Sequence, residues 1–240
     1  MTRPRLDLIM LVLALPLLSV EANSEVRVIG EMRRMFTAHD IGANVDLLSI
    51  NKNPHVYALG PLAGLQGEVT VLDGQVFAST VSDNQPKVMI DPGARSVFLV
   101  YASVPTWRSL DIPTNVITEK DLAEFLEAQM PTNTRSAFQV RGTAAMARFH
   151  IQNYKGLAKD LTHEAHDEAK SFFELKNAAV QLVGFFTNRD QDGGSFVHLG
   201  QTTHIHLLSA DRKQMGHLES IRLRAGAKLL LPALQKSSAS

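Results

Sequence analysis

The chain has 240 residues, contains no cysteine, and carries equal numbers of basic and acidic side chains, so its formal net charge at pH 7 is zero. The lack of thiols excludes a disulfide framework and thiolate metal sites, and the sequence shows no basic stripe of the kind that binds nucleic acid. Hydrophobic residues make up 45% of the sequence, which is enough for a buried core.

The N-terminus has the pattern of a secretory signal. Two arginines precede an apolar run over residues 8–18, and Val20 and Ala22 are small residues at the positions that a signal peptidase reads. The run is too short to span a membrane as a helix. We therefore expect a signal peptide over residues 1–22, one domain over residues 23–240, a secreted or periplasmic protein, and no stable membrane anchor after cleavage. The alternative is an uncleaved membrane anchor.

The first part of the domain begins with helical spacing and continues with strands. Residues 26–48 are expected to form a helix in two pieces. Further along, Asp73 and Gly74 separate two apolar runs, which predicts a β-hairpin. Glu68 begins the first of these runs. A carboxylate in an apolar strand needs a partner if it is buried; the alternative is an exposed carboxylate at a sheet edge.

A helix is predicted to begin at Thr118. This threonine is a suitable N-cap, and Asp121 stands at the capping-box distance. Strand character returns at residues 136–144, where Arg141 shares a face with other polar side chains. Its guanidinium either points into a pocket, where it holds a carboxylate with two hydrogen bonds, or lies on the solvent-facing side of the sheet.

Residues 147–176 are polar and are expected to form a solvated connecting segment. They contain His163-Glu164-Ala165-His166, which is one residue shorter than the His-Glu-x-x-His motif of zinc proteases. The two histidines of the shorter motif do not lie one helical turn apart, so no metal role is assigned to them.

Three histidines towards the C-terminus predict a metal site. His204 and His206 lie two apart in a β-branched and apolar run, so both side chains leave the same face of a strand. A turn at residues 211–213 follows, and then His217 on a returning strand. Three neutral imidazoles leave a fourth coordination position open, as in catalytic zinc sites. The alternative is that these are ordinary core or surface histidines.

Four stretches, in this order along the chain, resemble the α-acetolactate decarboxylase family. They are the glycine-rich run and turn at residues 57–74, the arginine strand at residues 138–142, the dense strand at residues 182–187, and the histidines at residues 204–206 with Gly216 and His217. The similarity extends over residues 26–232.

The resemblance implies an α/β (mixed α+β) fold of two intimately packed mixed β-sheet halves with flanking helices and a metal site on strands of the C-terminal half. It implies one Zn²⁺ held by His204, His206 and His217, with Glu68 and Arg141 as the catalytic residues. The expected reaction is the decarboxylation of 2-acetolactate to acetoin and carbon dioxide. The expected partners are a small-molecule 2-hydroxy-3-keto acid and, as one option, a second copy of the chain in a homodimer.

The expected chemistry assigns one task to each residue. Zinc would accept electron density through the substrate oxygens, Arg141 would hold the leaving carboxylate, and Glu68 would move protons next to the metal.

The chain departs from the family at Gln66, where the family has aspartate, and after Pro232, where no acidic residue takes the place of the family's C-terminal glutamate. The alternatives are an exported, non-catalytic zinc- and carboxylate-binding relative, or another zinc enzyme such as a hydrolase.

Overall fold

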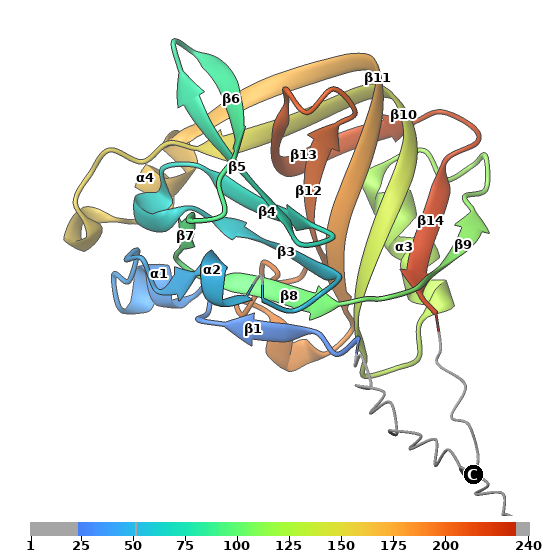
Figure 1. The fold of residues 1–240 in the computed structure, drawn as a ribbon, viewed down its shortest axis with the longest axis horizontal. Helices are drawn as coiled ribbons and strands as arrows, with labels where there is room; N and C mark the ends of the chain where they lie inside the picture. The colour runs from blue at the N-terminus through green and yellow to red at the C-terminus, as the bar shows by residue number, and fades with distance from the viewer. Residues whose placement is uncertain (1–23, 51, 234–240) are drawn as a thin grey trace, which may run out of the picture.

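The computed structural model describes residues 24–50 and 52–233 (Figure 1). The predicted signal peptide over residues 1–22 lies outside these residues, and the domain boundary stays a prediction. Among the helices of the described part of the chain, none is long and apolar enough to cross a membrane.

The first of two six-stranded sheets contains the N-terminal strands. In sheet order these are β1 (Arg27–Ile29), β8 (Leu99–Ser103), β3 (Val56–Pro61), β4 (Glu68–Leu72), β5 (Gln75–Ser82) and β6 (Gln85–Ile90). The predicted hairpin joins β4 to β5. Asp73 and Gly74 at its tip have φ values of 48° and 80°, and two positive φ angles are what a tight hairpin turn requires.

The second sheet contains the C-terminal strands together with β9 from the middle of the chain. Its order is β11 (Lys170–Thr187), β12 (Thr203–Ser209), β13 (Met215–Leu223), β10 (Arg135–Gln152), β14 (Lys228–Pro232) and β9 (Trp107–Asp111). Because β10 also pairs along its whole length with β11, the four strands β10 to β13 close into a ring. Figure 1 shows β10 and β11 as the two long, bent strands of the molecule.

The remaining elements are short, apart from one helix. They are α1 (Arg34–Thr37), α2 (Leu47–Ile50), α3 (Glu119–Gln129), α4 (His163–Glu168), the paired strands β2 (Val45–Asp46) and β7 (Arg95–Ser96), and 3₁₀ turns at Ala63–Leu65, Ala158–Asp160 and Asp190–Asp192. The predicted capping box of α3 is present, because Thr118 and Asp121 each accept a hydrogen bond from the backbone N–H of the other.

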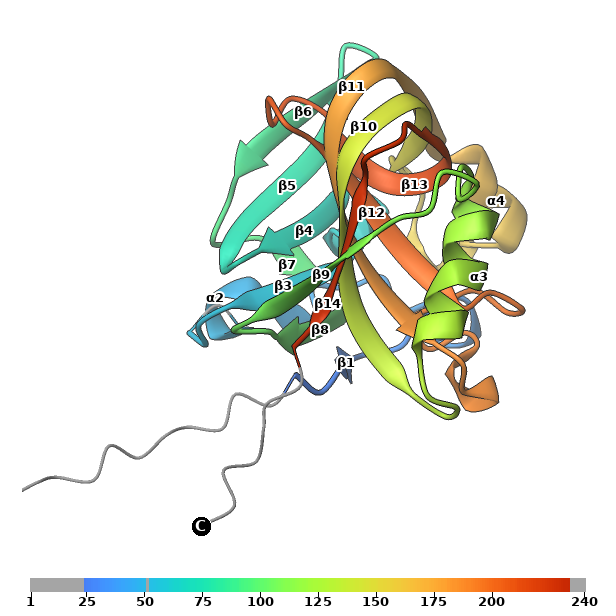
Figure 2. The same ribbon diagram turned by 90° about the vertical axis from the view of Figure 1, so that its right-hand side faces the viewer.

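The expected architecture of two packed sheet halves with few helices is confirmed. Within the described residues, all of the pairings between strands in both halves are antiparallel. Where α3 lies against the second sheet (Figure 2), Leu122 and Leu126 are fully buried with Phe138. Phe138 in turn packs over Gly184, where a Cβ atom would come within 2.2 Å of its ring. This contact explains the glycine within an otherwise bulky strand.

Two expectations about local structure are wrong. Residues 147–176 are not a solvated connection, because they contain the end of β10, α4 and the beginning of β11, and the ladder continues to the pair Gln152 and Lys170. The side chains of residues 149–152 at the end of β10 are all buried, so this part of the strand is covered on both faces. Residues 26–48 contain two strands, the single turn of α1 and the beginning of the single turn of α2, so most of the range expected to be helical is strand or loop.

Candidate metal centre

Three histidines form a row across three neighbouring strands. His206 of β12 stands opposite His217 of β13, and His217 stands opposite His150 of β10. Residues paired across a sheet point to the same face, and His204 shares that face because it lies two residues before His206. The ligand nitrogens of His204, His206 and His217 all lie within 4.8 Å of one another.

Hydrogen bonds on the far side of two rings set their orientation. Nδ1 of His204 lies 2.8 Å from the backbone carbonyl oxygen of Phe196, to which it donates, and Nδ1 of His206 lies 3.0 Å from the hydroxyl oxygen of Thr70. In the tautomer that donates from Nδ1, the Nε2 atom carries the free lone pair that a metal needs. Nε2 of His206 is buried and has no hydrogen-bond partner among the described residues.

The three imidazoles are kept in the neutral state that coordinates metal. Burial lowers the pKa of His204 to about 3. Burial also lowers the pKa of His206 and of His217 well below the usual range, and the neighbouring histidines lower both further. Neutral nitrogens, their spacing and the unpartnered Nε2 of His206 all fit a zinc ion with three histidine ligands.

Glu68 is the carboxylate of this centre. It is only 4% exposed, its Oε2 lies 3.7 Å from Nε2 of His206, and its Oε1 accepts a hydrogen bond of 3.0 Å from the backbone N–H of Gln152. Burial raises the pKa of Glu68 to about 8, against the lowering effects of that hydrogen bond and of the charge on Lys170. The prediction that Glu68 requires a partner in a buried strand is therefore confirmed.

Gly216 allows β13 to approach β10 closely. A Cβ atom at this position would lie 2.3 Å from the backbone oxygen of His150. The neighbouring rings of His150 and His217 stack with centroids 4.7 Å apart and planes inclined by 28°. The ring of His150 also contacts Glu219, because its Nδ1 lies 2.6 Å from a carboxylate oxygen of that residue.

The histidines open into a cavity with two parts. The inner part has a volume of about 40 Å³ and is walled by Glu68, histidines and the apolar side chains of Met32, Met35, Pro61, Leu65 and Phe98. The outer part has a volume of about 600 Å³ and is bordered by α1, α4, the beginning of α3 and residues 198–201. His166, Lys170, His198 and His217 line both parts. The centre is therefore a recessed site with an antechamber large enough for a small molecule.

The structure does not bring Arg141 to this centre. Arg141 is exposed on β10, where its Nη2 lies 3.4 Å from the side-chain oxygen of Gln139, and it lines neither part of the cavity. It therefore occupies the solvent-facing position that the strand pattern allowed as the alternative. On the same strand, His150 is the residue that reaches the metal centre.

Several cavity residues were not singled out from the sequence. They are His150, His166, Lys170, His198 and Glu219. His150 had a usable signal, because it lies among alternating apolar residues of a strand. Lys170 had none, and His166 was considered only in the shortened His-Glu-x-His motif and given no role, because the positions of both depend on how β10, α4 and β11 fold back on one another.

One comparison with known proteins shows the family of the chain, and the matching crystal structures share its fold. The sequence profile of alpha-acetolactate decarboxylase matches residues 57–236, well over half of the chain. The crystal structure of alpha-acetolactate decarboxylase from Bacillus subtilis strain 168 superposes with a TM-score of 0.70 at 17% identity, covering 87% of this chain and 86% of that chain. The enzyme from Bacillus subtilis subspecies spizizenii gives 0.70 at 18% identity, covering 88% and 86%.

A further crystal structure, from Staphylococcus aureus, is described as a protein of unknown function similar to alpha-acetolactate decarboxylase. It superposes with a TM-score of 0.67 at 14% identity, covering 86% of this chain and 84% of that chain. At such identities the structural likeness shows the fold alone. A search of curated proteins gives no match.

Proposed function

Since the chain belongs to the alpha-acetolactate decarboxylase family, we propose that it is a zinc-dependent enzyme that converts 2-acetolactate to acetoin and carbon dioxide. The observation that carries this proposal is the meeting of the nitrogens of His204, His206 and His217 within 4.8 Å, beside an inner cavity that His204 and His217 line. Three neutral imidazoles of this kind would hold one metal ion and would leave it able to bind a substrate.

The residues around the ion have distinct tasks in this reaction. Zinc bound here would supply a Lewis acid for the keto and hydroxyl oxygens of the substrate. Phe196 and Thr70 hold the rings of His204 and His206 in place through their Nδ1 atoms. Glu68 holds or accepts the proton of the substrate hydroxyl. Its carboxyl group is buried beside His206, and its Oε1 accepts a hydrogen bond from Gln152, which leaves Oε2 for the proton.

The inner wall favours the loss of carbon dioxide. A carboxylate is strongly hydrated in water, whereas carbon dioxide is neutral, so a site that removes water from the carboxylate favours the product side. Met32, Met35 and Phe98 present apolar surface to the histidines. The same surface accepts the methyl groups of the proposed substrate.

One experiment tests the proposal directly. The purified, zinc-loaded protein is incubated with racemic 2-acetolactate, and acetoin and carbon dioxide are measured against a sample treated with a chelator. We expect equal amounts of both products in the zinc-loaded sample and none above background in the chelated one. A folded protein that contains zinc and forms no acetoin would refute the proposed reaction.

The exposed position of Arg141 favours a second candidate, a family relative that binds zinc and a carboxylate without turnover. The arginine expected to hold the leaving carboxylate does not face the cavity. This candidate predicts that the protein binds an unreactive carboxylate analogue in calorimetry while the acetoin assay stays at background.

We also propose export, which the apolar run at residues 8–18 supports. Residue Asn23 should then be the first residue of the mature protein. N-terminal sequencing of protein recovered outside the cytoplasm tests this, and an intact Met1 there would contradict it.

A further inference from the structure

Among the described residues that line the inner part of the cavity there is one cationic side chain, Lys170, and no role has yet been assigned to it. A 2-hydroxy-3-keto acid enters as an anion, and a carboxylate removed from water needs a partner of opposite charge. We propose that Lys170 is the carboxylate-binding residue of this site. The identity of the anion, a 2-hydroxy-3-keto acid, rests on the proposed function. Lys170 would then hold the substrate carboxylate, which is the task that the family resemblance implied for Arg141.

Lys170 is placed at the junction of the inner and outer cavity. It is the first residue of β11 and stands opposite Gln152, the last residue of β10. The backbone N–H of Gln152 is the group that holds Glu68. The side chain of Lys170 is only 18% exposed and lines both parts of the cavity, so an anion moving inwards from the outer part passes its ammonium group.

The other cations are less suitable for this task. Among the described residues, Lys170 is the only lysine or arginine that lines the inner part. Arg33 borders the outer part only, its side chain is 53% exposed, and its guanidinium forms two hydrogen bonds of 2.8 Å with Glu31. Arg141 lines neither part.

The present partner of Lys170 leaves room for a second anion. Its Nζ lies 2.8 Å from a carboxylate oxygen of Asp167, whose side chain is 67% exposed. An ion pair with such a solvated carboxylate is weak. An ammonium group has three N–H donors, so Lys170 can keep this contact and still donate to a substrate carboxylate.

The charge of Lys170 also acts on four titratable groups that line the inner part of the cavity. Burial is the largest influence on the pKa of Glu68, His150, His166 and His198, and the ammonium group lowers the pKa of all four. Its field therefore reaches both the carboxylate and the histidines at the place where an anion would lie.

The test compares a charged probe with a neutral one. The acid 2-hydroxy-2-methylbutanoate lacks the keto group, so it cannot lose carbon dioxide by the proposed route, and 2-hydroxy-2-methylbutanamide has the same shape without the charge. Titration calorimetry on the zinc-loaded protein measures the affinity for each. We expect Lys170→Gln to weaken binding of the acid by about tenfold or more, as for a lost hydrogen bond to a charged group, and to leave binding of the amide unchanged.

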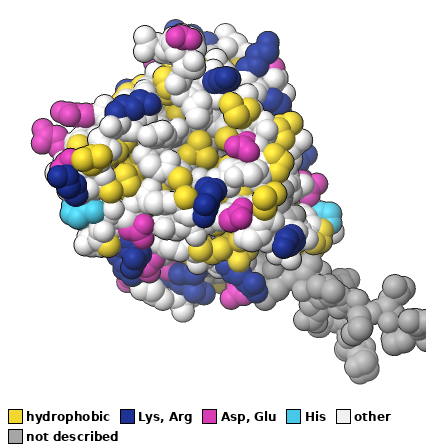
Figure 3. Space-filling view, turned by 60° about the vertical axis from the view of Figure 1, so that its left-hand side comes forward, with side chains coloured by type: hydrophobic (Ala, Val, Ile, Leu, Met, Phe, Trp, Pro, Cys, Tyr) yellow, Lys and Arg dark blue, Asp and Glu magenta, His cyan; other side chains and the backbone are white. Residues whose placement is uncertain are grey.

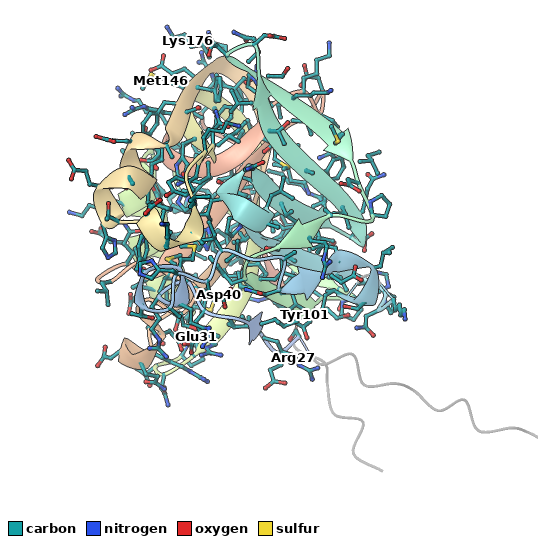
Figure 4. The ribbon with its side chains drawn as sticks, turned by 90° about the vertical axis from the view of Figure 1, so that its left-hand side faces the viewer. Arg27, Glu31, Asp40, Tyr101, Met146 and Lys176 are labelled. Atoms are coloured by element: carbon teal, nitrogen blue, oxygen red, sulfur yellow. The ribbon has the colours of Figure 1, made fainter. Side chains whose placement is uncertain are left out.

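Lys176→Gln is the matched control. Lys176 belongs to the same strand six residues after Lys170, is exposed, and stands opposite Met146, and both residues lie at the top of Figure 4. This control should bind both probes as the wild type does. Lys170→Arg, which keeps the charge, should recover most of the affinity for the acid. Zinc content and melting temperature should be the same in all variants.

Three results would overturn the inference. In the first, the wild type binds the acid no better than the amide. In the second, Lys170→Gln binds the acid as tightly as the wild type does. In the third, Lys170→Gln loses the same amount of affinity for the acid and for the amide. Failure of the proposed function looks different: the wild type would bind the acid through Lys170 and still form no acetoin. If acetoin is formed, Lys170→Gln should raise KM by about tenfold or more, because the lost contact is made by the ground state as well.

Discussion

His206 and His217 stand directly opposite each other in the ladder between β12 and β13, with their ring centroids 5.7 Å apart. The strand pairing sends both side chains to the same face of the sheet, and the contact of Nδ1 with Thr70 orients the ring of His206. The hairpin therefore presents two imidazoles to one point before any ion is present, and His204 joins them from the same strand.

Replacing His206 with Asn should remove most of the bound zinc, because the shorter side chain ends before the position of Nε2. We expect about one zinc per chain in the wild type and a small fraction of that in the variant. Elemental analysis after dialysis measures it. His55→Asn serves as the control, since His55 is exposed and paired with Asp73. Equal zinc in wild type and His206→Asn would exclude this residue as a ligand.

Thr70→Val tests the support behind His206. The substitution keeps the shape of the fully buried side chain and removes the hydroxyl that lies 3.0 Å from Nδ1 of His206. Loss of such a partner commonly weakens metal binding by about 10- to 100-fold. Competition with a chelator of known affinity gives the dissociation constant. Thr80→Val on the neighbouring strand should show no change, and a similar shift in both variants would contradict the assignment.

Glu68→Gln should separate turnover from metal binding. The amide keeps the size of the side chain and can still accept the hydrogen bond from Gln152, but it cannot take up a proton. A lost general base typically lowers kcat by about 10²- to 10⁴-fold. Acetoin formation and zinc content are measured together, with Glu174→Gln on the exposed face of β11 as the control. Full activity of Glu68→Gln would remove it from the reaction.

Arg141→Lys should leave both turnover and zinc content within about twofold of the wild type. This follows from the exposed position of the guanidinium and its contact with Gln139, since surface substitutions of this kind change little. The resemblance to the family on its own predicts the opposite, a large loss of turnover. The same acetoin assay decides between the two, and a loss of a hundredfold would mean that Arg141 reaches the substrate.

Asp192 should make stability depend on pH. Burial on its own raises the pKa of Asp192, but hydrogen bonds from Arg135 and Thr187 outweigh it and hold the pKa below its usual range. The stabilisation is thus fully present above the pKa of the unfolded chain, about 4, and is lost as the pH falls through the lower pKa of the folded state.

Asp192→Asn should therefore lower the free energy of unfolding at pH 7 by about 2 kcal/mol, and the difference from wild type should shrink towards pH 3. Urea unfolding across this range measures both effects. Asp190→Asn, in the same turn but exposed, is the control. A difference that stays constant with pH would mean that the carboxylate charge is not what stabilises the turn.

The sequence allowed prediction of those parts of the site that depend on local periodicity. His204, His206 and His217 follow from two-residue alternation and one hairpin, whereas the strand of Glu68 left open whether its carboxylate is buried or exposed at a sheet edge. Arg141 shows where this reasoning stops. It lies nine residues before His150 on β10, which is about 30 Å along an extended strand, and alternation cannot tell which end of an 18-residue strand enters the cavity.

The surface could be predicted only in its general character. Equal numbers of basic and acidic residues suggested an interspersed surface, and on the face drawn in Figure 3 side chains of both signs alternate with uncharged ones. The antechamber could not be predicted in this way, because α1, α4 and residues 198–201 come from three distant parts of the chain. Their meeting depends on the closed ring of strands.

That ring also sets the order in which a metal ion and the protein come together. The three ligands need only the β12–β13 hairpin, whose contacts are local and form early, whereas their enclosure needs β13 to pair with the distant β10, a step slowed by the entropy of closing a long loop. An ion can therefore enter while the ring is still open. Once the ring has closed, an ion exchanges with solvent through the cavity that His204 and His217 line, so the rate of zinc loss to a chelator measures passage through this cavity.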